Sequence, residues 1–138
     1  MKIIMLQGNS GVGKTSTINL VYDKFIESGA QIVEQREQAG GNVNDFTCML
    51  KYNNLLIAIC SMGDFAKDVI GYIDTYDEKN ADILICACNS KFIKPVDKIK
   101  NYEHIIIEKT TFEHVNTIDA NKILKEFELE LSMDVNNK

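Results

Sequence analysis

The chain has 138 residues, and its 15 Lys and Arg residues against 20 Asp and Glu residues give a formal net charge of −5. This length predicts a single domain over residues 1–133, followed by a frayed tail at residues 134–138. The negative balance leaves no general basic field that would gather nucleic acid or anionic lipid, which argues against nucleic acid as the main partner.

The first residues, MKIIML, carry one lysine and only a short apolar run, which is typical of neither a secretory signal nor a membrane span. All four cysteines lie within apolar runs and lack the Cys-x-x-Cys spacing of a zinc site, which favours buried, reduced thiols. We therefore expect a cytoplasmic protein that does not engage a membrane.

Residues 2–6 (KIIML) form the first of four short, continuously apolar runs. The others span residues 55–60, 83–88 and 104–107. This pattern is typical of strands covered on both faces, as in a parallel sheet between helices. A helix is predicted over residues 15–28, where apolar residues recur at helical spacing and a glycine follows.

The sequence GNSGVGKT at residues 8–15 fits the pattern G-x-x-x-x-G-K-[ST] between a predicted strand and a predicted helix. Its glycines let backbone N–H groups turn inward, and the helix N-terminus adds partial positive charge, so the loop suits an anion with many oxygens. We predict that Lys14 reaches the β- and γ-phosphates and that the Thr15 hydroxyl binds Mg²⁺. The predicted nucleotide-binding residues are Asn9, Ser10, Gly11, Val12, Gly13, Lys14, Thr15 and Ser16. The alternative is a glycine-rich turn with a purely structural role.

On this motif, residues 2–28 resemble the first strand, the Walker A loop and the first helix of the P-loop nucleoside triphosphatase superfamily. The resemblance implies a three-layer α/β/α fold, the P-loop NTPase fold, with a mostly parallel central sheet and one antiparallel hairpin strand. It also implies a nucleoside triphosphate and Mg²⁺ as ligands. The motif specifies a superfamily and not one activity.

After the first helix, the chain departs from a simple alternation of strand and helix. Residues 31–37 are predicted to form a strand. Residues 46–52 are predicted to form a hairpin with the run at 55–60, because Asn53 and Asn54 tolerate the positive φ of a tight turn.

Three polar residues of this segment are candidate site residues. Asp45 and Thr47 follow a Gly-Gly-Asn loop and are candidates to approach the γ-phosphate or an acceptor, while Asp45 also suits a turn. Arg36 is the only arginine of the chain, and kinases of the superfamily often place substrate-handling residues near the end of the second strand. The alternative for Arg36 is a surface residue paired with Glu34 and Glu37.

A P-loop enzyme needs an acid near its Mg²⁺, usually at the carboxyl end of a core strand. The run at 55–60 leads into SMGD, which ends at Asp64, whereas the run at 83–88 leads into Asn-Ser. Asp64 is therefore the predicted Walker B-like group, holding Mg²⁺ with Thr15 either directly or through water. The alternative is that Asp64 caps the helix that begins at Phe65.

The motifs of small GTPases do not occur at the expected places. Their post-strand motif is Asp-x-x-Gly, whereas the order here is Gly63-Asp64. The segment NSKF at residues 89–92 has serine at the lysine position and phenylalanine at the aspartate position of the guanine-reading Asn-Lys-x-Asp motif. ATP is therefore favoured over GTP.

The rest of the chain is predicted to hold helices over residues 64–77 and 118–132. Residues 89–102 are predicted to form a loop or a short helix. This stretch follows the strand at 83–88, where many nucleotide kinases carry a lid, and it contains Lys91, Lys94, Lys98 and Lys100. These lysines form either a small, lysine-based phosphate clamp or a solvated charged surface.

We expect an ATP-binding protein that is closer to small nucleotide-kinase-like members of the superfamily than to GTPases. It would be either a Mg²⁺-dependent ATPase, which is a hydrolase, or a kinase-like phosphotransferase with an unidentified acceptor. The expected catalytic residues are Lys14 and Asp64, with the metal on Thr15 and Asp64. A second hypothesis is a nucleotide-dependent switch or binding module, in which the nucleotide orders residues 38–47 and a protein partner or second copy reads them.

Overall fold

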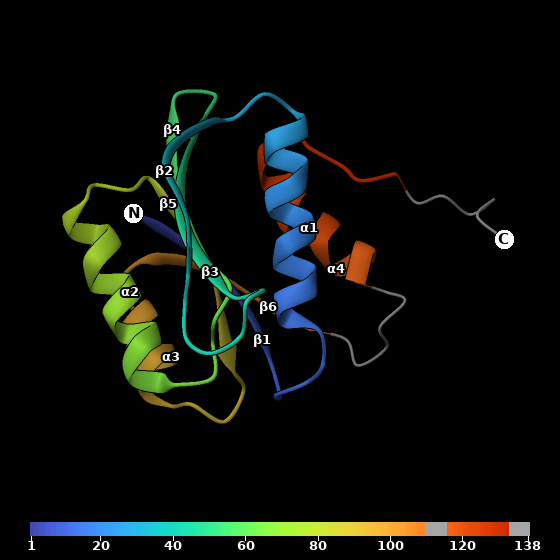
Figure 1. The fold of residues 1–138 in the computed structure, drawn as a ribbon. Coiled ribbons are helices and arrows are strands. Elements are labelled where there is room, and N and C mark those ends of the chain that lie inside the picture. The colour runs from blue at the N-terminus through green and yellow to red at the C-terminus, as the bar shows by residue number, and fades with distance from the viewer. Residues whose placement is uncertain (110–115, 133–138) are drawn as a thin grey trace, which may run out of the picture.

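A computed structural model describes residues 1–109 and 116–132, so the expected frayed tail at 134–138 lies outside the described residues. The elements, in chain order, are β1 (Lys2–Gly8), α1 (Lys14–Glu27), β2 (Gln31–Gln38), β3 (Phe46–Tyr52), β4 (Leu55–Cys60), α2 (Ala66–Glu78), β5 (Ile83–Asn89), α3 (Lys94–Ile99), β6 (Glu103–Glu108), α4 (Asn116–Leu124) and the 3₁₀ turn η2 (Lys125–Phe127). The strands form one sheet in the order β2-β3-β4-β5-β1-β6. Helices α1 and α4 lie on one side of the sheet, and α2 and α3 lie on the other (Figure 1).

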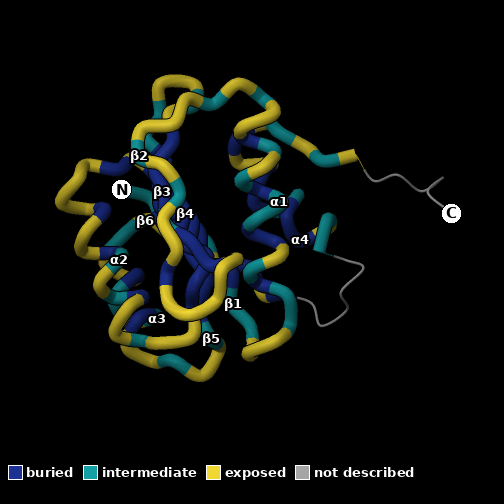
Figure 2. Tube along the Cα trace, in the orientation of Figure 1, coloured by how far each residue is buried: buried dark blue, intermediate teal, exposed yellow. Residues whose placement is uncertain are grey.

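The strands β4, β5, β1 and β6 are parallel to one another. Strands β1, β4 and β5 bury side chains on both faces, whereas the edge strand β6 buries only Ile107, so coverage on both faces does not hold for the run at 104–107. In β1, for example, Ile4 and Leu6 join the core under α1 and α4, whereas Ile3 and Met5 join the core under α2. Figure 2 shows this buried stretch running through the centre of the fold. The expectation that the continuously apolar runs form strands is confirmed, because each of the four runs lies within one of these strands.

The expectation of a mostly parallel P-loop NTPase sheet is wrong. The sheet is mixed, because it begins with β2-β3-β4, whose two pairings are both antiparallel. The cause is the length of the connections. Residues 39–45 join β2 to β3 and Asn53-Asn54 join β3 to β4, whereas parallel neighbours need a crossover of about a dozen residues or more.

The helices differ in length from the predicted ones. Helix α2 begins at Ala66 rather than at residue 64. Helix α4 and its 3₁₀ turn end at Phe127, short of residue 132, because Glu128 adopts a left-handed conformation with a φ of 59°. Between residues 89 and 102 the chain forms the short helix α3, with Pro95 in its first turn. No helix in the described ranges is both long enough and apolar enough to cross a membrane.

Several loops meet at the edge of the sheet where the parallel strands end. The segments after β1, β2, β4 and β5 all lie at the lower end of the view in Figure 1. The segment after β4 passes very close to β5, because the N–H of Asn89 donates a 3.0 Å hydrogen bond to the carbonyl of Gly63. A Cβ atom on Gly63 would lie 2.5 Å from the carbonyl carbon of Ala87, which leaves room for glycine alone.

This close approach gives a test of the fold. Gly63→Ala should lower the free energy of unfolding by about 1–3 kcal/mol, because the methyl group meets backbone that cannot move aside without disturbing β5. Gly71→Ala is the matched control, since nothing lies within 4 Å of the added Cβ in α2 and alanine favours a helix by about 1 kcal/mol. Urea unfolding measures both variants. Equal stability of the two would contradict the packing described here.

Candidate functional site

The segment between β1 and α1 forms a loop around the N-terminus of α1. Gly11 and Gly13 adopt φ values of 80° and 99°, a left-handed region that costs glycine little. The first N–H groups of α1 have no acceptor within the helix, and a pocket of about 510 Å³ lies against this end. The pocket is lined by Gly11, Val12, Gly13, Lys14, Thr15, Ser16, Asn42, Asp45, Gly63, Asp64 and Asn116.

Lys14 is the cation of this loop, and only 6% of it is exposed. Its Nζ donates hydrogen bonds of 2.8 Å and 2.9 Å to the carbonyl oxygens of Gly8 and Asn9. Burial lowers the pKa of Lys14, while the charges of Asp64 and Asp45 act in the opposite direction. The ammonium group therefore donates its hydrogen bonds to carbonyls of its own loop. An anionic ligand would be a stronger acceptor and would replace these carbonyls as its partner.

Thr15 and Asp45 come together although they are far apart in the sequence. The Thr15 hydroxyl donates a 2.7 Å hydrogen bond to Oδ1 of Asp45, and the Ser61 hydroxyl donates a second one of 3.0 Å. Asp45 is only 5% exposed, and its N–H bonds to the carbonyl of Asn42 in the turn that leads into β3. The interpretation of Asp45 as a turn residue fits this position. Asp45 also lines the pocket, and its approach to a γ-phosphate or an acceptor stays a prediction.

Asp64 lies at the exposed rim of the same pocket. Its Oδ1 accepts a long hydrogen bond of 3.5 Å from the Ser10 hydroxyl. The interpretation of Asp64 as the cap of α2 is wrong, because the N-cap residue is Phe65 and no side chain caps the helix. The predicted role of Asp64 as a metal ligand stays a prediction, and Asp45 is the carboxylate that contacts Thr15.

Two residues at the end of β5 hold the loop in place. The Ser90 hydroxyl donates a 2.6 Å hydrogen bond to Oδ1 of Asn9, and Nδ2 of Asn89 donates one of 3.3 Å to the Ser10 hydroxyl. The predicted binding residues Asn9 and Ser10 therefore face β5 and do not line the pocket named above. Sequence reasoning missed these two contacts, although a polar pair directly after a buried core strand was a usable signal.

Asn116, the first residue of α4, is another residue of the site that was not predicted from the sequence. It lines the pocket, and its Oδ1 is so close to Gly13 that a Cβ there would lie 2.9 Å away. This oxygen is buried and has no hydrogen-bond partner among the described residues. No periodicity or motif in the sequence marks Asn116 as a pocket residue.

Arg36 is not among the described residues that line the pocket. Its guanidinium carbon lies 3.8 Å from the ring centroid of Phe46 and 4.7 Å from that of Tyr22. Its Nη2 donates a 2.8 Å hydrogen bond to Oδ1 of Asn19. The structure therefore supports neither a phosphate contact nor a pairing with the neighbouring glutamates.

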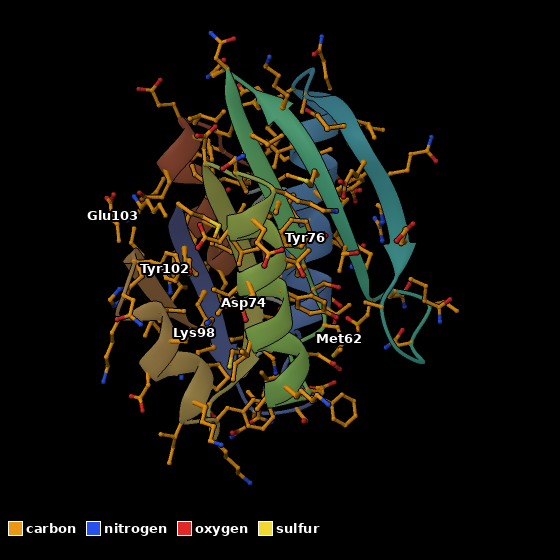
Figure 3. The ribbon with its side chains drawn as sticks, turned by 90° about the vertical axis from the view of Figure 1, so that its left-hand side faces the viewer. Met62, Asp74, Tyr76, Lys98, Tyr102 and Glu103 are labelled. Atoms are coloured by element: carbon orange, nitrogen blue, oxygen red, sulfur yellow. The ribbon has the colours of Figure 1, made fainter. Side chains whose placement is uncertain are left out.

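The lysines near α3 do not form a clamp over the pocket. Lys98 pairs with Asp74 of α2 at 2.7 Å, and Lys100 pairs with Asp97 at 3.3 Å. Lys98 and Asp74 are labelled in Figure 3. None of the four lysines is among the described residues that line the pocket. The interpretation as a charged surface fits their positions.

The burial of Lys14 has a consequence that needs no ligand to test. Its pKa is lowered in the folded protein from the ordinary value of 10.5. Between the lowered pKa and 10.5, the unfolded chain holds more protons than the folded one, so the free energy of unfolding rises with pH there. The stability of the wild type relative to Lys14→Met should therefore increase as the pH approaches 10.5, as measured by urea unfolding at a series of pH values. A difference that falls with pH would show that burial does not disfavour the ammonium form.

No protein-family model, curated protein or solved structure matches the chain. The likeness of residues 2–28 to the P-loop superfamily therefore depends on the loop and its two flanking elements alone. A function for the pocket has to come from its own residues and geometry.

Proposed function

We propose that the chain binds a nucleoside triphosphate, ATP in preference to GTP, together with Mg²⁺ at the pocket beside α1. The observation that carries the proposal is the position of the motif at residues 8–15, which encloses the N-terminus of α1 and contributes Lys14 and Thr15 to one pocket. We also propose a cytoplasmic location. All four cysteines are free and buried, which suits a reducing compartment.

The phosphate half of the proposal is supported by the backbone. A helix N-terminus with unpaired N–H groups binds anions, and residues without bulky side chains let a phosphate approach it closely. Gly13 is the residue directly before α1, and its positive φ turns the chain into the helix. Lys14 is then the one lysine among the described lining residues that can neutralise the β- and γ-phosphates.

The metal half of the proposal is supported by oxygen donors. The Thr15 hydroxyl, Asp45 and Asp64 line one pocket, and hard oxygen ligands are the ones that Mg²⁺ prefers. Within the described ranges, no three His, Cys, Asp or Glu side chains form a metal cluster. The two carboxylates of the pocket, Asp45 and Asp64, fit Mg²⁺, which is usually held by one or two carboxylates together with phosphate oxygens and water.

The proposed chemistry is hydrolysis of ATP or transfer of its γ-phosphoryl group to a small acceptor. When bound, Mg²⁺ neutralises charge on the β- and γ-phosphate oxygens. Lys14 adds one positive charge, the loop backbone orients the phosphates, and Asp45 holds the Thr15 hydroxyl in place. Because Arg36 lies on aromatic rings away from the pocket, this chain supplies no arginine to the phosphates and turnover should be slow.

Thermal unfolding with a panel of nucleotides tests the proposal. ATP with Mg²⁺ at about 100 times its Kd should stabilise the protein by roughly 2.7 kcal/mol, and GTP should do so less. Lys14→Ala should abolish the shift, because the phosphates lose their cation. Lys51→Ala, which removes an exposed lysine of β3, is the matched control and should shift like the wild type. If no nucleotide stabilises the wild type, the proposed function is wrong.

A nucleotide-dependent switch is a second candidate, and one observation favours it. Residues 39–45 are attached to the helix behind the phosphate loop through Asp45, and through the carbonyl of Asn44, which accepts a 3.1 Å hydrogen bond from Asn19. Ligands at Thr15 would therefore act directly on this segment.

Hydrogen exchange with ADP and with a non-hydrolysable ATP analogue tests the switch. Stronger protection of the amides of residues 39–45 with the ATP analogue is expected, because Asp45 lines the pocket and is a candidate to approach the γ-phosphate. Protection in residues 83–89 of the buried strand β5 should be the same in both states and serves as an internal control. Equal protection of residues 39–45 in both states would remove this candidate.

A further inference from the structure

The only arginine of the chain occupies a fixed place at the sheet edge. Arg36 lies in β2 with its guanidinium over Phe46 at 3.8 Å and near Tyr22 at 4.7 Å, and these two rings contact each other edge to face. A planar guanidinium held on aromatic faces loses little freedom when it also donates a hydrogen bond. The 2.8 Å bond from Nη2 to Oδ1 of Asn19 therefore has a defined direction.

Asn19 connects Arg36 to the pocket. Its Nδ2 donates hydrogen bonds to the carbonyl oxygens of Thr15 at 2.9 Å and Asn44 at 3.1 Å. The two ends of a side-chain amide are not equivalent, since the oxygen only accepts and the nitrogen only donates. Arg36 can only donate, so it fixes Oδ1 on its own side and directs both N–H groups of Asn19 toward the two carbonyls. A flipped amide would place an oxygen against two oxygens.

One of the two carbonyls that accept hydrogen bonds from Asn19 is that of Asn44, the residue directly before Asp45. The same turn is closed by hydrogen bonds from Asp45 N to Asn42 O at 3.1 Å and from Ala39 N to Asp45 O at 2.9 Å. Asp45 then accepts the Thr15 hydroxyl. Hydrogen bonds thus connect Arg36 to Thr15 by two routes. The first runs through Asn19 to the Thr15 carbonyl, and the second runs through Asn19, Asn44 and Asp45 to the Thr15 hydroxyl.

We propose that Arg36 and Asn19 are positioning residues that hold residues 39–45 against α1 and keep Asp45 on Thr15. Within the described part of the chain, the Arg36 side chain contacts Tyr22, Phe46 and Asn19, none of which lines the pocket, so Arg36 acts through Asn19. The consequence for Mg²⁺ affinity rests on the proposed function, whereas the positioning itself does not.

Hydrogen exchange on the ligand-free protein tests the positioning. Arg36→Met keeps a long apolar side chain but removes the donor, and it should speed exchange of the amides of Ala39 and Asp45 by about tenfold, as expected for the loss of a charged hydrogen bond. Arg36→Lys, which retains a donor, should restore part of the protection. Lys79→Met is the matched control, because Lys79 also lies over a ring, that of Tyr76, and pairs with Glu34 of β2. Unchanged exchange in Arg36→Met overturns the proposal.

Calorimetric titration of a non-hydrolysable ATP analogue, with and without Mg²⁺, tests the consequence for the metal. Mg²⁺ raises the affinity of the wild type for the analogue by some factor, and in Arg36→Met this factor should be about tenfold smaller. The affinity without Mg²⁺ should be the same in both proteins. Asn19→Asp should do the same, because a carboxylate still pairs with Arg36 but cannot donate to either carbonyl.

The outcomes are distinguishable. If the wild type binds no nucleotide but Arg36→Met speeds exchange, the positioning role stands and the proposed function fails. If Arg36→Met keeps the full Mg²⁺ gain, or loses affinity equally with and without Mg²⁺, the link to the metal is overturned.

Discussion

The candidate site depends on one hydrogen bond, from the hydroxyl of Thr15 to the buried carboxylate of Asp45. It joins helix α1 to the antiparallel edge of the sheet. A buried carboxylate is costly unless donors surround it, and Thr15 and Ser61 each provide a hydroxyl. The bond also sets the direction of the Thr15 side chain. An oxygen-rich corner therefore exists beside the loop without any ligand.

The mixed sheet makes this contact available. The parallel strands β1, β4 and β5 end at one edge of the sheet, and the reversal of the chain in β3 places the start of β3 at the same edge. If β3 ran parallel to β4, Asp45 would lie at the opposite edge, roughly 20 Å away for a strand of seven residues. The feature that separates this sheet from the expected parallel one is thus the feature that brings a carboxylate to Thr15.

Much of the fold could be predicted from the sequence because its signals are local. The apolar run at β1 and the glycines of the loop at residues 8–15 each specify a conformation through their own chemistry. The turn at Asn53 and Asn54 is equally local, and both residues adopt a positive φ there. Local signals could not indicate that Asp45, and not Asp64, is the carboxylate that contacts Thr15. Its contact with Thr15 spans 30 residues and depends on the strand order, which local patterns do not contain.

The same limit explains the mistaken hypotheses for Arg36. Sequence alone shows an arginine beside glutamates, but its partners Tyr22 and Asn19 come from the preceding helix, and Phe46 comes from the next strand. With Arg36 committed to these groups, Lys14 is the residue that would bring positive charge to the phosphates in the proposed site. The most direct test of the account is a crystal structure with a non-hydrolysable ATP analogue and Mn²⁺, located by its anomalous signal. The account predicts the triphosphate within residues 8–15 and the cation beside the Thr15 hydroxyl, on the side of Asp45. A nucleotide bound elsewhere, or a cation away from Thr15, would contradict it.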